Sequence, residues 1–122
     1  MKPGKSGMAR LFDAAGYSIK GIRAAWRNEA AFRQEVALCG VLFPLSFFVA
    51  RSIEQWLLLT TPLLLLLIVE LLNSAIENVV DRIGSERHDL SGRAKDMGSA
   101  AVLVCLLMLA VAWFSIGWKN FA

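Results

Sequence analysis

The chain has 122 residues, of which 57% are hydrophobic and 19% are charged, with a net charge of +3 and a mean hydropathy of +0.54. Soluble domains are about 45–50% apolar, so this composition argues against a disordered chain, a coiled coil, a disulfide scaffold and most soluble enzymes of this size. A chain of this length forms one domain, and we expect residues 1–122 to be a single all-α membrane domain.

The first predicted element, over residues 6–28, is an amphipathic helix. Its apolar residues recur at steps of three and four, which places them within an arc of about 100°. They are Met8, Leu11, Phe12, Ala15, Ile19, Ile22 and Trp26. Because Lys20, Arg23 and Arg27 follow one flank of this stripe, we expect a helix lying on the membrane surface. The alternative, a soluble helix packed on the bundle, is less favoured because the sequence offers no soluble core to receive it.

Three long apolar runs follow, and each predicts a membrane-spanning helix. A hydrocarbon core about 30 Å thick is crossed by about 20 helical residues, and backbone groups in lipid must pair within their own segment, which favours helices. Gly84 predicts the end of the second span, and Asp89 or Ser91 predicts the N-cap of the third. We expect the three spans to cover residues 31–50, 54–83 and 92–118.

Basic residues are distributed unevenly about these spans. Seven precede Val36, where the first uncharged apolar run begins, and four surround the connection between the second and third spans, whereas only Arg51 and Lys119 lie on the other side. The positive-inside rule therefore predicts a cytoplasmic N-terminus and a C-terminus outside the cytoplasm.

A polar stripe crosses the second span. Glu70, Asn73, Ser74, Glu77 and Asp81 fall within an arc of about 100° on a helix. Ionisable residues inside a span are costly and mark functional sites. A polar seam that holds an oligomer together would explain Asn73 and Ser74. It would explain two glutamates poorly, because neighbouring carboxylates repel unless they are protonated, paired or bound to a metal. For Ser74, a functional role and a role in holding an oligomer together both stay open.

Depth separates the two glutamates. If Arg82 marks the cytoplasmic interface, Glu77 lies about 7–8 Å and Glu70 about 18 Å below it, at about 1.5 Å per residue. Glu77 is then within reach of a hydrophilic ligand, and Glu70 of a lipid headgroup. Further acids and bases share the cytoplasmic level, and carboxylates with nearby cations suit Mg²⁺ and phosphate. These residues are Glu29, Glu86, His88, Lys95 and Asp96. Membrane anchoring is the alternative role for Arg87, Arg93 and Lys95.

Several segments together resemble the bacterial integral-membrane diacylglycerol kinase family, over essentially the whole chain. The most specific of them is the Glu-x-x-Asn-Ser-x-x-Glu pattern of residues 70–77. The segments are AAGYS at 14–18, RAAW at 23–26, NEAAFRQE at 28–35, VELLNSAIE at 69–77, VDRIG at 80–84 and SGRAKDMGSAA at 91–101.

The resemblance implies a homotrimer of three-span subunits with surface helices and active sites shared between subunits. It implies transfer of the γ-phosphoryl group of MgATP to 1,2-diacylglycerol, giving phosphatidic acid and ADP. It also implies Mg²⁺ as cofactor, the bilayer as the source of lipid, no nucleic-acid partner, and a place in the bacterial inner membrane with the C-terminus in the periplasm.

The resemblance also implies roles for single residues. Glu70 corresponds to the base on the lipid hydroxyl, and Glu29 and Glu77 to the ligands of the metal and the ATP phosphates. The other residues implied on the ATP side are Arg10, Tyr17, Glu86, Arg87, His88, Lys95 and Asp96. Besides Glu70, those implied on the lipid side are Arg10, Ala14, Ala15, Arg23, Trp26, Ala31, Phe32, Arg33, Gln34, Glu35, Trp56, Asn73 and Ser99.

Three alternatives stay open at the level of sequence. An undecaprenol kinase of the same family is the nearest. A small multidrug transporter also carries a membrane glutamate, but it predicts four spans and no dense charged cluster beside the carboxylates. A noncatalytic assembly subunit would leave the aligned carboxylates unexplained.

Overall fold

The computed structural model describes residues 6–84 and 88–122, and this part of the chain folds into helices without strands. The three helices α2, α3 and α4 are long and apolar enough to cross a membrane. The predicted all-α membrane architecture with three candidate spans is therefore confirmed. The helices are α1 (Gly7–Asn28), α2 (Ala30–Val49), α3 (Ile53–Ile83) and α4 (Asp89–Phe121).

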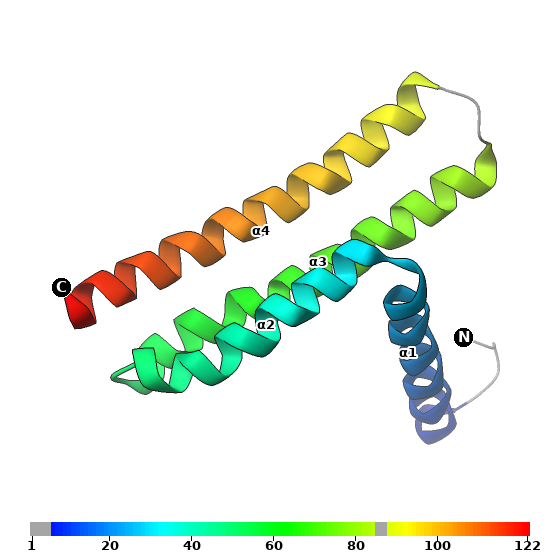
Figure 1. Cartoon of the computed structure of the whole chain (residues 1–122). Coiled ribbons are helices and arrows are strands. Elements are labelled where there is room, and N and C mark those ends of the chain that lie inside the picture. Colours follow the sequence, from blue (N-terminus) through cyan, green and yellow to red (C-terminus); the bar gives the residue numbers. More distant parts are fainter. Residues whose placement is uncertain (1–5, 85–87) are drawn as a thin grey trace.

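Helix α3 is the centre of the bundle. It packs mainly against α4 and also against α2, whereas α2 and α4 meet over a short stretch (Figure 1). The core between α3 and α4 is formed by Leu63, Leu66, Cys105 and Leu109. Both cysteines are free, as expected of thiols that serve as packing residues.

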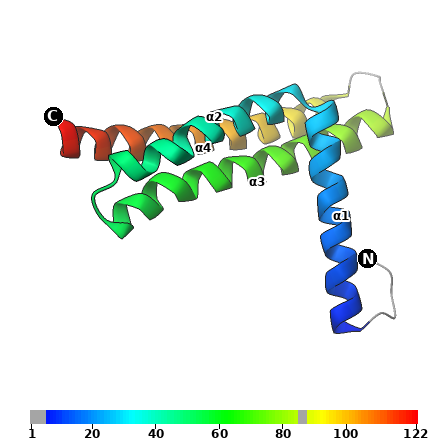
Figure 2. The ribbon, with the colours of Figure 1, turned by 60° about the horizontal axis from the view of Figure 1, so that its bottom comes forward.

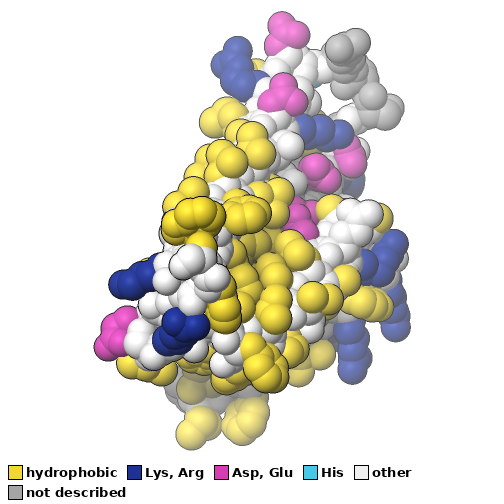
Figure 3. Space-filling model, turned by 60° about the vertical axis from the view of Figure 1, so that its left-hand side comes forward, with side chains coloured by type: hydrophobic (Ala, Val, Ile, Leu, Met, Phe, Trp, Pro, Cys, Tyr) yellow, Lys and Arg dark blue, Asp and Glu magenta, His cyan; other side chains and the backbone are white. Residues whose placement is uncertain are grey.

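Most of the apolar surface of the spans lies on the outside of the chain. Leu64 is 65% exposed and Phe114 is 80% exposed. Hydrophobic side chains cover the middle of the face shown in Figure 3, with charged side chains toward its edges. Exposed apolar surface on this scale is expected where lipid or another subunit provides the cover.

Helix α1 turns away from the bundle (Figure 2). Ala25, in its last two turns, is the residue of α1 that becomes buried. Met8, Leu11 and Phe12 are 69%, 67% and 75% exposed, so the apolar stripe at the start of α1 is left uncovered by the described part of the chain. This arrangement favours the membrane-surface role of α1 over packing on the bundle.

The ends of α3 and α4 are fixed by local contacts. Ser52 caps the start of α3 by accepting a hydrogen bond from the backbone N–H of Gln55 at 3.1 Å, and α3 ends before Gly84 as predicted. The prediction of Asp89 or Ser91 as the N-cap of α4 is wrong, because the cap is His88, whose Nδ1 accepts from the backbone N–H of Leu90 at 3.0 Å. An imidazole nitrogen can replace the usual oxygen acceptor at this position.

The far end of the bundle is closed by Asn120, near the end of α4. Its Nδ2 donates to the carbonyl oxygen of Val49 at 2.7 Å and to Oε1 of Gln55 at 2.8 Å. The backbone N–H of Arg51 donates to the same Oε1 at 2.9 Å. Because the last carbonyls of a helix have no partner within it, Asn120 satisfies the end of α2 and ties α4 to the connection between α2 and α3.

Replacing Asn120 with alanine is expected to lower the thermal unfolding midpoint in micelles. The carbonyl of the half-buried Val49 would lose its donor, and an unsatisfied group costs up to about 1–3 kcal/mol when it is fully buried. Lys119→Ala is the matched control, because Lys119 is the exposed neighbour on the same helix. Equal midpoints for the two variants would show that the Asn120 contacts do not stabilise the bundle.

Candidate functional site

The polar stripe of α3 runs from the inside of the bundle to its exposed end. Glu70, Asn73 and Ser74 are buried, with exposures of 4%, 8% and 4%, whereas Glu77 is half-buried and Asp81 is exposed. The stripe therefore connects a carboxylate deep between the helices with carboxylates that water and soluble ligands can reach. A buried ionisable group on a membrane helix is a candidate for chemistry.

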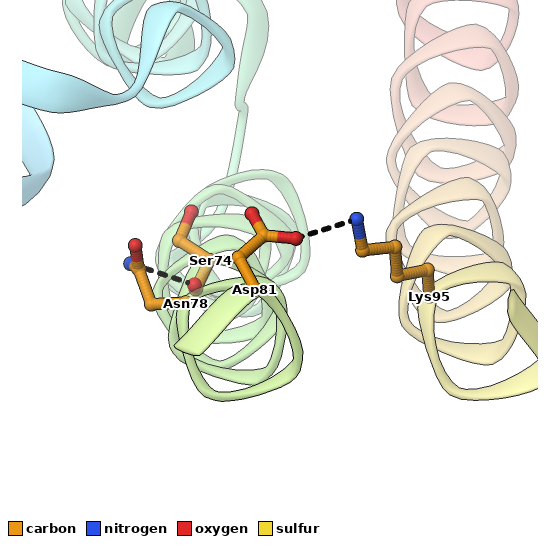
Figure 4. Close-up of polar contacts among 4 residues, drawn as sticks. All are labelled: Ser74, Asn78, Asp81 and Lys95. Carbon is orange, nitrogen blue, oxygen red and sulfur yellow. Dashed lines mark hydrogen bonds and ion pairs between the residues drawn. The ribbon is translucent and has the colours of Figure 1, made fainter. Parts of the chain in front are cut away.

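Glu29 is brought to this stripe by the junction between α1 and α2. It is the single non-helical residue between the two helices, with an extended backbone (φ −118°, ψ 104°). Its Oε1 accepts a hydrogen bond from Nδ2 of Asn78 at 3.3 Å, and this amide also donates to the carbonyl of Ser74 at 2.9 Å. Figure 4 shows the Asn78 side chain turned back along α3 toward Ser74. Asn78 therefore anchors Glu29 to α3.

Arg33 supports the same junction from α2. Its Nη1 donates to the carbonyl oxygen of Trp26 at 2.7 Å and to that of Arg27 at 3.4 Å. These carbonyls belong to the last turn of α1, where a cation is favourable because it complements the helix dipole. Arg33, which was predicted on the lipid side, thus helps to set the direction in which α1 leaves the bundle.

Three other glutamates interact electrostatically with Glu70 at the buried end of the stripe. Glu70 interacts electrostatically with Glu29 and Glu77, and Glu35 of α2 interacts with Glu70. Oε2 of Glu35 and Oδ1 of Asn73 are buried and have no hydrogen-bond partner within the described part of the chain. Buried polar atoms normally have partners, so these two unpartnered acceptors are unusual features of this part of the bundle.

The carboxylates of the site could bind Mg²⁺ only together with a substrate that completes its coordination. Among the described residues, no group of three or more His, Cys, Asp or Glu side chains is arranged to hold a metal ion. Mg²⁺ usually binds one or two carboxylates and completes its shell with water and substrate phosphates. Glu29 at the junction of α1 and α2 and Glu77 on the polar stripe of α3 are the candidates for those two carboxylates.

A charged cleft lies beyond the exposed end of the stripe. Nζ of Lys95 on α4 contacts Oδ1 of Asp81 on α3 at 2.7 Å, and both side chains are exposed (Figure 4). An exposed ion pair contributes only about 0–1 kcal/mol to stability. The main effect of this pair is to hold the Lys95 ammonium and the Asp81 carboxylate at the rim of the cleft. The cleft has a volume of about 840 Å³, and its lining includes His88, Arg93 and Asp96. This volume is in the range of small-molecule sites.

A second cleft, of about 410 Å³, lies between α1 and α3. Its polar lining includes Asn28, Glu29, Ser74 and Asn78. The Glu29 carboxylate is therefore accessible from the side of α1, while the Lys95 cleft opens on the side of α4. The polar stripe of α3 lies between the two.

The fold keeps the predicted site residues of α1 apart from the predicted site residues of α4. Arg10, Tyr17, Ala15 and Arg23 are exposed and Ala14 is half-buried. In the described part of the chain α1 contacts α2 and α3 but does not approach α4. One subunit thus does not bring Arg10 and Tyr17 together with the predicted ATP-side residues of α4.

The remaining lipid-side residues lie at several levels of the bundle. Phe32 is buried at the start of α2, whereas Ala31 and Gln34 are exposed, as are Trp26 on α1 and Ser99 on α4.

Trp56 lies near the opposite end of α3 from the charged cleft. It packs against Phe43 and Phe47, with ring centroids 6.2 and 5.5 Å apart. Fourteen residues separate it from Glu70, a distance of about 21 Å along the helix. Trp56 therefore does not belong to the group around Glu70.

Two predicted residues, Glu86 and Arg87, lie outside the described residues. Two further residues of the site escaped the sequence analysis. Asn78 lies about 80° from Glu70 around the helix, just outside the polar arc, and this position was the signal that could have found it. Gly98 on α4 is buried against Asn73, and no pattern within the sequence indicates that contact.

Known proteins resemble this chain over most of its length. Residues 16–116 match the family model of prokaryotic diacylglycerol kinase. The chain is 52% identical to the diacylglycerol kinase of Escherichia coli, over 95% of both chains. It is 52% identical to that of Pseudomonas aeruginosa, over 93% of this chain and 92% of the relative, and 46% identical to that of Haemophilus influenzae, over 91% and 94%. The chain therefore belongs to the prokaryotic diacylglycerol kinase family.

Proposed function

We propose that the protein transfers the γ-phosphoryl group of MgATP to the free hydroxyl of 1,2-diacylglycerol, giving phosphatidic acid and ADP. The observation that carries this proposal is the buried Glu70 carboxylate on a membrane-length helix, in a chain of the prokaryotic diacylglycerol kinase family. A substrate that is itself a membrane lipid can present its hydroxyl at this depth. The names of the related proteins support the same acceptor.

The transfer is direct. The lipid hydroxyl oxygen bonds to the γ-phosphorus while the bond from that phosphorus to the ADP oxygen breaks, and the hydroxyl proton passes to Glu70. Such a transition state needs positioning and charge neutralisation more than covalent catalysis. When bound, Mg²⁺ supplies charge neutralisation at the phosphates, and Glu29 and Glu77 are its proposed ligands. Lys95 supplies a further positive charge from the α4 side.

The substrates occupy opposite ends of the stripe in this proposal. ATP lies at the exposed end, against Lys95, Asp96 and His88. The other proposed ATP-side residues are Arg10, Tyr17, Glu86 and Arg87. The lipid headgroup lies at the buried end, beside Glu70, Glu35 and Asn73. The acyl chains extend along the membrane-facing surfaces of the spans.

A homotrimer in the bacterial inner membrane, with a cytoplasmic N-terminus, accompanies this proposal. The separation of α1 from α4 within the described chain supports it, because a second subunit can bring Arg10 and Tyr17 to Lys95 and Asp96. The exposed apolar faces of the spans supply surface for that contact. The clustering of basic residues at one level supports the orientation.

Purified full-length protein in mixed micelles with MgATP tests the proposed function. We expect ADP release and a phosphorylated lipid with diacylglycerol, and slower turnover with undecaprenol as acceptor. Omitting each lipid in turn controls for ATP hydrolysis by water. Preference for undecaprenol would move the chain to the other branch of the family, and no ADP with either lipid would reject kinase activity.

A further inference from the structure

We propose that Gly98 is a positioning residue: the lack of a side chain on α4 at this point keeps the Asn73 amide in place beside Glu70, an inference that rests on the proposed role of the Glu70 site.

Helices α3 and α4 approach each other closely at Gly98. Gly98 is buried, and a Cβ atom placed on it would overlap with Oδ1 of Asn73 and lie 3.2 Å from its Cγ. Contacts this short force the neighbour to move. The three atoms nearest to the added Cβ belong to the Asn73 side chain, not to the backbone of α3.

The lack of room for a side chain distinguishes Gly98 from the other glycines of α4. A Cβ on Gly92 or on Gly117 would have no atom within 4 Å outside its own stretch of helix. Alanine is also a better helix former than glycine, by about 1 kcal/mol. Helix propensity alone thus predicts that alanine would be tolerated or stabilising at all three positions, and steric conflict distinguishes position 98.

The Asn73 side chain has little room to give way. It is 8% exposed and lies one turn from Glu70, with whose carboxyl group its amide interacts. Ser74 beside it on α3 is also buried, at 4%. A methyl group at position 98 would displace the amide from its place beside the Glu70 carboxylate. A displacement of about 1 Å at a reacting group can lower turnover about 100-fold.

A merely structural role for Gly98 predicts a different pattern. Small residues allow membrane helices to approach closely, and a methyl group would then separate α3 from α4 whatever the side chain at position 73. If the conflict is with the Asn73 side chain, removing that side chain must remove it.

Four proteins test this difference in micelles: the wild type, Gly98→Ala, Asn73→Ala and the double variant. We expect Gly98→Ala to lower kcat by about 10- to 100-fold, with the KM for MgATP unchanged. In the Asn73→Ala background the same change is expected to have no further effect on kcat. Gly117→Ala is the control on the same helix and is expected to turn over like the wild type.

Thermal unfolding midpoints of the same proteins provide the second readout. If Gly98→Ala does not fold, a double variant that folds and matches Asn73→Ala supports the steric contact. An equal loss from Gly98→Ala in both backgrounds, or wild-type kcat in Gly98→Ala, would overturn the inference. If even the wild type shows no lipid kinase activity, the proposed function fails. The unfolding midpoints then still test the contact: Gly98→Ala should lower the midpoint less in the Asn73→Ala background than in the wild type.

Discussion

Glu70→Gln is expected to lower kcat by about 100- to 10,000-fold, the range that general acid–base groups contribute. Glutamine has nearly the same shape as glutamate but cannot take the hydroxyl proton. Because Glu70 is only 4% exposed, a water-exposed carboxylate cannot replace it as the base in the variant. The KM for MgATP is expected to stay close to that of the wild type, since we propose that the lipid, and not ATP, lies beside Glu70. The measurement is the rate of ADP release in micelles at saturating lipid.

The control for this experiment is Glu54→Gln. Glu54 lies in the first turn of the same helix and is exposed, so the charge change is identical while the site is untouched. Size-exclusion chromatography checks that both variants keep the assembly of the wild type. Near-normal turnover of Glu70→Gln would exclude this carboxylate as the base.

Glu77→Gln is expected to raise the Mg²⁺ concentration needed for half-maximal activity. Loss of groups that only support metal ligands lowers affinity about 10- to 100-fold, and a direct ligand should have at least that effect. Glu77 is half-buried one turn beyond Ser74, so the amide fits without repacking. High Mg²⁺ should restore much of the turnover, whereas it should not restore Glu70→Gln.

Titrations of Mg²⁺ at fixed ATP and of ATP at saturating Mg²⁺ separate the two proposed roles of Glu77. Glu54→Gln again controls for the loss of one negative charge. Wild-type curves in both titrations would mean that Glu77 binds neither the metal nor the phosphates. A shift in the ATP curve alone would assign Glu77 to the nucleotide and not to Mg²⁺.

The helices and the polar stripe could be predicted from the sequence because both depend on local periodicity. A long apolar run determines a span whatever it packs against, and five polar residues at helical spacing share a face in any helix. The burial of Glu70 also follows from that face, because α3 lies between two neighbours.

The contacts that complete the site are not local, and this is why they were not predicted. Asn78 reaches Glu29 across 49 residues of sequence, and Gly98 meets Asn73 between two different helices. The direction of α1 depends on the backbone dihedrals of Glu29 and on the cap from Arg33, which residue types alone do not determine. The His88 cap was missed because neighbouring Asp89 and Ser91 are more usual acceptors.

The connection between α1 and α2 is a single residue, Glu29, and has no spare length. A longer loop can absorb an inserted or deleted residue, but here one extended residue joins two helices. Adding or removing a residue here would change the direction in which α1 leaves the bundle, or would pull Glu29 away from Asn78. The number of residues at this junction is therefore as much a part of the site as their chemistry.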